Sequence, residues 1–197
     1  MDGRFRKFNV LPNILDRQPT KKEVSLSAFS FLFAEIVRQC RNNVATTDEW
    51  EERLAELGYQ VGIRALDLAV TRDRNPKRET NLVNMLAFVQ TNCWKMLFGK
   101  AASRLEKIDE NKYTIVDDDM LVCQYISVPA DLKPLSCAAF VAGIVKAILD
   151  GSQFSAKVTA HSTPQAQEGL LNQTRFLVEF DDHVVAREMR LAETRKK

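Results

Sequence analysis

The sequence predicts an α+β fold, with helices packed on a four-stranded antiparallel sheet in a single two-layer domain. Three observations favour this class. Residues 136–150 are apolar nearly all the way round, with Lys146 their one charge before Asp150, so such a helix must be covered on several sides. Residues 155–161 then alternate between polar and apolar, as in a strand with one covered face. Helical patterns dominate the first half and strand patterns the second, an order typical of layered α+β domains.

Composition limits the possible functions. The chain has 197 residues, enough for one domain with a substantial core, and its net charge of +2 is too small to indicate a nucleic-acid partner. It has no secretory or lipidation signal and no long apolar run, which predicts a cytosolic protein. In that reducing environment we expect four free, buried cysteines, namely Cys40, Cys93, Cys123 and Cys137.

Three regions are predicted. Residues 1–22 form a basic flexible arm, residues 23–190 the folded domain, and residues 191–197 a basic tail. The arm also carries apolar residues such as Phe5 and Phe8. Two interpretations of it stay open: a flexible tail, or a segment that lies along a partner or near an anionic membrane surface.

The first helix is expected over residues 25–44. Its main apolar stripe follows a spacing of three and four, but Phe31 and Leu32 lie off that stripe and give the helix a second apolar face. A surplus face indicates either burial in a larger core or contact with another subunit. The candidates for a partner interface are Phe29, Phe31, Leu32, Phe33, Ile36 and Val37.

The next segment reads as two helices. Thr46 and Glu49 form a capping box that opens a helix ending at Gly58, and a further helix runs from Tyr59 to about Thr71. The spacing of Gly58 and Gly62 indicates close packing of two helices. Adjacent carboxylates such as Glu51 and Glu52 are expected to face water.

The second half supplies the sheet. After a long helix over residues 79–99, strands at 113–116 and 121–128 are expected to flank Asp117–Asp119 as a hairpin, with a turn favoured over a Mg²⁺ site. Ser136 is expected to cap the central helix, and Gly151 to end it in the left-handed conformation. A polar loop over 162–172, a last strand over 174–180 and a helical tail from Asp182 complete the chain.

Catalytic chemistry is not indicated. The two histidines, His161 and His183, are in no metal spacing, and neither a glycine-rich phosphate loop nor a nucleophile elbow is present in the sequence. No catalytic, cofactor-binding or metal-binding residue is therefore predicted, and the chain is expected not to be an enzyme.

Several ordered blocks resemble a known family. They include Arg78-Glu-Thr, Trp94-Lys-Met-Leu-Phe-Gly-Lys-Ala-Ala and Cys137-Ala-Ala-Phe-Val-Ala-Gly-Ile-Val, with further blocks at 23–33, 57–66, 125–129 and 156–161. Together they resemble the small subunits of the transport protein particle (TRAPP) complex, most closely the subunit 5 branch. The resemblance covers roughly residues 22–190.

The resemblance implies a function. The family's complex tethers vesicles and is a guanine-nucleotide exchange factor for Rab-type GTPases in ER-to-Golgi transport, with one variant acting in autophagy. It implies that this chain is a non-catalytic core subunit at Golgi and endoplasmic reticulum membranes. Its expected partners are paralogous small subunits, in a heterodimer through the early helices, and indirectly a Rab-type GTPase.

One family feature is missing, and one alternative stays open. The founding paralogue carries an acylated Cys shortly before its Arg-Glu-Thr block, whereas the loop Thr71-Arg-Asp-Arg-Asn-Pro-Lys has none, so no acylation is expected there. The alternative function is a small-molecule sensor, because bacterial four-vinyl-reductase-type domains resemble this fold. It would require an apolar core pocket.

Overall fold

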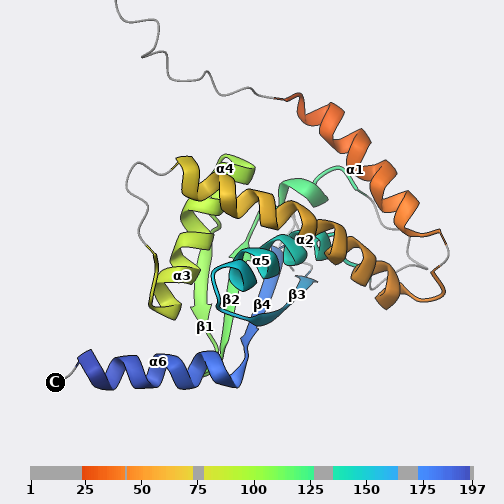
Figure 1. The fold of residues 1–197 in the computed structure, drawn as a ribbon. Helices are drawn as coiled ribbons and strands as arrows, with labels where there is room; N and C mark the ends of the chain where they lie inside the picture. The colour runs from red at the N-terminus through yellow and green to blue at the C-terminus, as the bar shows by residue number, and fades with distance from the viewer. Residues whose placement is uncertain (1–23, 43, 73–77, 127–134, 164–172, 196–197) are drawn as a thin grey trace, which may run out of the picture.

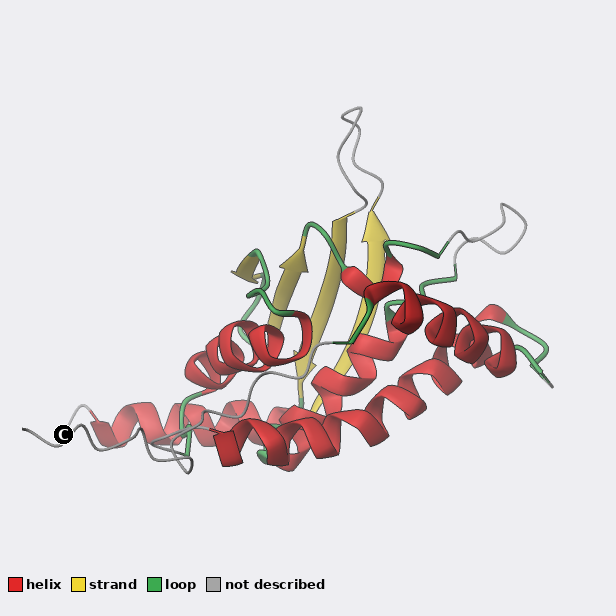
Figure 2. Ribbon diagram, turned by 90° about the horizontal axis from the view of Figure 1, so that it is seen from above, coloured by secondary structure: helices red, strands yellow, loops and turns green. Residues whose placement is uncertain are grey.

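A computed structural model describes residues 24–42, 44–72, 78–126, 135–163 and 173–195. In these residues, helices gather on one side of a four-stranded antiparallel sheet (Figure 1 and, from above, Figure 2). The predicted α+β class is therefore confirmed. The predicted arm over 1–22 and most of the predicted loop over 162–172 lie outside the described residues.

The sheet has the strand order β1-β2-β4-β3, so that β1 and β3 are its edges. The strands are β1 (Arg104–Lys107), β2 (Lys112–Asp117), β3 (Ala156–Thr163) and β4 (Gln173–Phe180). In the register, Ile115 of β2 lies opposite Phe176 of β4, which lies opposite Ala160 of β3. All three are buried, so this row belongs to the covered face.

The central helix α5 (Ala139–Gly151) fills the space above the sheet. Nine of its 13 residues are buried, including Val141, Ile144 and Leu149, while Lys146 is exposed. The prediction of a helix covered on several sides is confirmed. Its cover is the sheet on one side and helix α2 on another.

Helix α2 (Thr47–Arg72) is one continuous helix of 26 residues, so the predicted break at Gly58 is wrong. The predicted cap is present at its start, where the Glu49 N–H donates to Thr46 Oγ1 at 3.2 Å. Gly58 is buried where α2 crosses α5, and a Cβ there would overlap the carbonyl oxygen of Phe140. Gly58 therefore serves the close packing of two helices, as its spacing from Gly62 predicted, and does not end the helix.

Other helices complete the cover. They are α1 (Leu26–Cys40), α3 (Leu82–Phe88), the π-helical segment η2 (Val89–Cys93), α4 (Trp94–Phe98) and α6 (Asp182–Arg195). The long helix expected over residues 79–99 corresponds to α3, η2 and α4, and Gly99, at φ 79°, ends α4. The predicted helical tail is present as α6, which is anchored by the fully buried Val184 and extends away from the domain (Figure 1). It runs through Arg195, so it includes part of the predicted basic tail.

The predicted hairpin around Asp117–Asp119 is wrong. The hairpin is formed by β1 and β2, and residues 121–123 form the short 3-10 helix η3 (Leu121–Cys123) where a strand was expected. Asp117 ends β2 with its side chain 1% exposed, and the Trp94 Nε1–H donates to Asp117 Oδ2 at 2.8 Å. The Asp117 carboxylate, which the sequence pattern assigned to a turn, is therefore buried between β2 and α4.

Both predicted ends of the central helix are also wrong. Ala138 occupies the N-cap position without a side-chain cap, and Ser136 is buried. The Ser136 N–H instead donates to Glu51 Oε1 at 2.5 Å. At the other end Gly151 is still helical, and Gln153 adopts the left-handed conformation at φ 63°. Tertiary contacts of α2 thus replace the local capping that the sequence indicated.

Candidate interaction surfaces

Helix α1 has one face in the core and one face in solvent. Phe33 is 1% exposed and packs edge-on against Phe140 of α5, with ring centroids 5.3 Å apart. Phe31 and Leu32, by contrast, are 79% and 60% exposed. Because two large apolar side chains in succession are costly to leave in water, this face is a candidate for contact with another chain.

The six predicted interface residues separate accordingly. Phe31 and Leu32 are exposed, Phe33 and Val37 are buried in this chain's own core, and Phe29 and Ile36 are partly buried against it. The second apolar face that the sequence indicated is therefore real, but only Phe31 and Leu32 present most of their surface to solvent. A helix of 15 residues thus divides into a packing stripe and an open stripe.

Helix α2 carries further exposed apolar residues, which the sequence prediction missed. Leu57, Val61 and Leu68 are each between 40% and 44% exposed. By helical spacing they share the side of α2 that carries Trp50, which binds α1 through a hydrogen bond from its Nε1–H to the carbonyl oxygen of Val37. They were missed because a three-and-four spacing of apolar residues does not distinguish a core stripe from a solvent-exposed one.

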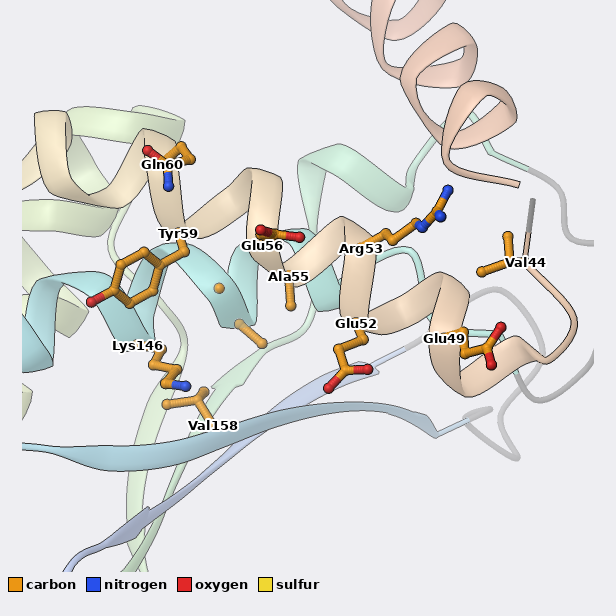
Figure 3. A pocket seen from close by; sticks show the side chains of 12 residues that line it. Val44, Glu49, Glu52, Arg53, Ala55, Glu56, Tyr59, Gln60, Lys146 and Val158 are labelled. Atoms are coloured by element: carbon orange, nitrogen blue, oxygen red, sulfur yellow. The ribbon is translucent and has the colours of Figure 1, made fainter. Parts of the chain in front are cut away.

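A groove lies on another side of α2. It has a volume of about 810 Å³ and lies between α2, α5 and the edge strand β3. Figure 3 shows Glu52 and Lys146 reaching from the two helices toward β3, where Val158 points back into the space. Tyr59 also lines it, and its pKa is raised by burial first and then by Asp150. The groove is a polar site without an evident reactive group.

A second cavity, of about 720 Å³, lies beside the C-terminal half of α2. Its apolar lining includes Leu66, Val70, Met85 and Phe88. At its rim the Arg78 guanidinium donates to Gln153 Oε1 at 3.0 Å. Five residues of the neighbouring loop, 73–77, lie outside the described residues, and the predicted absence of acylation concerns that loop.

The described side chains offer little acid–base chemistry. Burial raises the pKa of the Cys93 and Cys123 thiols to about 12, which makes them poor nucleophiles. Within the described residues, no group of three His, Cys, Asp or Glu side chains could hold a metal ion. Contrary to expectation, Glu51 is half-buried; burial raises the pKa of its carboxyl group, against the lowering effect of the Ser136 N–H.

None of the helices in the described part of the chain is both long enough and apolar enough to cross a membrane.

Comparison with known proteins assigns the family. Residues 29–181 match the family model described as "Transport protein particle (TRAPP) component". The chain is 43% identical over 195 residues to trafficking protein particle complex subunit 5 of Homo sapiens, covering 97% of this chain and 98% of that protein. It is likewise 43% identical over 180 residues to the subunit 5 of Dictyostelium discoideum, covering 89% of this chain and 96% of that one.

A solved structure agrees with the fold. It is a trafficking protein particle complex subunit 3 from Naegleria fowleri, covalently bound to palmitic acid. The two structures superpose with a TM-score of 0.66 at 15% identity, covering 80% of this chain and 95% of the other. Since the family model spans most of the sequence and close relatives cover it nearly end to end, the chain belongs to the transport protein particle (TRAPP) component family.

Proposed function

We propose that this chain is a non-catalytic core subunit of a TRAPP trafficking complex and binds a paralogous small subunit through α1 and the adjoining side of α2. The observation that carries the proposal is the exposure of Phe31 and Leu32 on a helix whose opposite face is packed. Leu57, Val61 and Leu68 extend the exposed apolar surface along α2. Permanent subunit interfaces bury apolar surface of this kind, in areas of about 2,000 Å² or more.

The finer role follows from the family resemblance. The assembled complex would act as a guanine-nucleotide exchange factor for a Rab-type GTPase in ER-to-Golgi transport, at the Golgi and endoplasmic reticulum membranes, and in one variant in autophagy. Exchange requires a surface that stabilises the nucleotide-free GTPase. In this proposal other subunits form most of that surface, and this chain fixes their positions.

The interface is tested by co-expression with a subunit 3 paralogue and size-exclusion chromatography with light scattering. Wild type should give a 1:1 complex, whereas the double variant Phe31→Glu/Leu32→Glu should elute as a folded, unpaired chain because two carboxylates would be buried without partners. Val83→Glu is the matched control, since Val83 is a 49% exposed apolar residue on α3. A 1:1 complex that survives the double change would remove α1 from the interface.

The exchange role is tested by release of a fluorescent GDP analogue from Rab-type GTPases. The isolated chain should leave the spontaneous rate unchanged, while the reconstituted complex should accelerate release. When the complex is reconstituted with Phe31→Glu/Leu32→Glu, this chain should fail to join it, and the complex should no longer accelerate nucleotide release. Nucleotide release by the chain alone would show that it is catalytic in its own right.

A small-molecule ligand is the second candidate function. The observation that favours it is the apolar lining of the 720 Å³ cavity, with Arg78 at its rim. Such a cavity has the size and character of a site for an amphiphile. Native mass spectrometry of the full chain would detect a stoichiometric adduct in wild type that is lost in Val70→Arg; a spectrum of the bare polypeptide mass would count against the sensor function.

A further inference from the structure

The groove between α2 and β3 has two different walls. One wall is a helix with outward-facing carboxylates, and the other is the free edge of a sheet. The buried Ala142 and Gly143 of α5 form part of its floor. Helix α2 and strand β3 therefore face each other across an open groove.

The edge strand is long and unprotected. β3 has eight residues, about 26 Å of extended chain at 3.3 Å per residue, and among the described residues it pairs only with β4. No described backbone group outside the sheet donates to or accepts from its outer edge. Proline is absent from it. An edge strand of this length presents a row of backbone N–H and C=O groups on which another strand can pair.

Two carboxylates on the α2 wall of the groove have no ion-pair partner among the described residues. Within the groove, the Glu49 carboxylate already accepts from the Ala45 N–H and the Arg53 guanidinium donates to the carbonyl oxygen of Asn42. Glu52 and Glu56 form no ion pair with another described residue. They stand one helical turn apart, about 6 Å along the axis, close to the spacing of about 6.7 Å between alternate side chains of a strand.

The floor contributes one cation. Lys146 likewise forms no ion pair with a described residue, and its ammonium group can only donate hydrogen bonds. A peptide lying against β3 would present carbonyl oxygens to such a donor. The two carboxylates of Glu52 and Glu56 outnumber the one ammonium group of Lys146, so this part of the groove is negatively charged. A negative groove favours a ligand with basic side chains.

We infer that this groove binds an extended segment of a partner protein, which adds as a fifth strand to the edge of β3 and places alternate basic side chains opposite Glu52 and Glu56. The site is distinct from the proposed subunit interface. By helical spacing, Glu52 and Glu56 lie on a different side of α2 from Leu57, Val61 and Leu68. Either proposal can therefore fail without the other.

The test starts from a displayed library of random heptapeptides, selected on the full chain. Enriched peptides should carry Lys or Arg at alternate positions, and their affinities are then measured by fluorescence anisotropy. Glu52→Lys/Glu56→Lys should weaken binding about tenfold or more, since it replaces two attractions by repulsions. The matched control Glu106→Lys/Glu110→Lys, on and beside the opposite edge strand β1, should leave the affinity unchanged.

Two further measurements separate strand addition from simple charge attraction. An enriched peptide is made in two forms, one methylated on the backbone nitrogens of its odd positions and one on those of its even positions. One form should lose binding and the other should keep it, because only one set of N–H groups faces β3. The variant Phe31→Glu/Leu32→Glu should bind the peptide as wild type does. The proposal is overturned if no peptide is enriched, if Glu52→Lys/Glu56→Lys binds as well as the control, or if neither methylation register matters.

Discussion

Gly143 of α5 faces Ala55 of α2 so closely that a Cβ at position 143 would overlap the Ala55 carbonyl oxygen. The obstacle is backbone, which cannot rotate away as a side chain does. The central helix is thus held at a distance from α2 that only a residue without a side chain permits. This contact positions α2, and with it both surfaces proposed above.

Gly143→Ala should therefore destabilise the chain by about 1–3 kcal/mol, the range expected for overpacking, despite the better helix propensity of Ala. Gly151→Ala in the same helix is the control. A Cβ there meets only the side chain of Leu66, so its effect should stay within about 1 kcal/mol. Urea unfolding followed by circular dichroism measures both. Equal effects would mean that the helix crossing tolerates a methyl group.

Two phenylalanines of α1, Phe31 and Phe33, should differ strongly in their effect on stability. Phe33→Ala removes a ring that is 1% exposed and should cost about 3–5 kcal/mol of unfolding free energy. Phe31→Ala removes one that is 79% exposed and should change the stability of the isolated chain by less than about 0.5 kcal/mol. Thermal unfolding of the isolated chain separates them. A large loss for Phe31→Ala would show that its ring packs within the chain.

Replacing Asp117 by an apolar residue should lower the free energy of unfolding. Asp117→Ala would leave the Trp94 Nε1–H buried without an acceptor, at a cost of about 1–3 kcal/mol. Asp117→Asn keeps an acceptor oxygen and should cost less. The two variants are compared by denaturant midpoint. Equal midpoints for Asp117→Ala and Asp117→Asn would contradict this expectation.

Glu51 should make the folded chain less stable as the pH rises. Burial raises the pKa of its carboxyl group above the ordinary value of 4.5, so the folded chain holds this proton more tightly than the unfolded chain. Its contribution is therefore largest below pH 4.5 and declines as the pH rises through the folded-state pKa. Glu51→Gln, whose amide oxygen still accepts from the Ser136 N–H, should remove that decline. Unfolding midpoints of both proteins between pH 4 and pH 7 test this; parallel profiles would contradict it.

The cysteines should react slowly in the folded chain. The pKa values of Cys93 and Cys123 are raised to about 12 and that of Cys137 to about 11, so little thiolate exists at neutral pH. Iodoacetamide at pH 7.5, followed by mass spectrometry, should modify them only after addition of denaturant. Rapid modification of native Cys123, the partly exposed one, would refute this expectation.

The sequence by itself determined the class of fold, the buried central helix and the two-faced first helix. These follow from periodicity, because an apolar residue every three or four positions, or every second one, specifies which side of an element avoids water. It also carried enough ordered blocks to indicate the family. It misplaced the break at Gly58, the hairpin and both ends of α5, because local signals for caps and turns are weak beside packing against another element.

Only the tertiary structure decided what each apolar or charged side chain faces. Phe31 and Phe33 are the same residue type two positions apart, yet one is open and the other buried, since α5 lies against one side of α1 alone. The groove likewise brings Glu52 of α2 together with Lys146 and Val158, which follow it by more than 90 residues on α5 and β3. Spacing along a chain describes one element at a time, whereas a surface is made where elements meet.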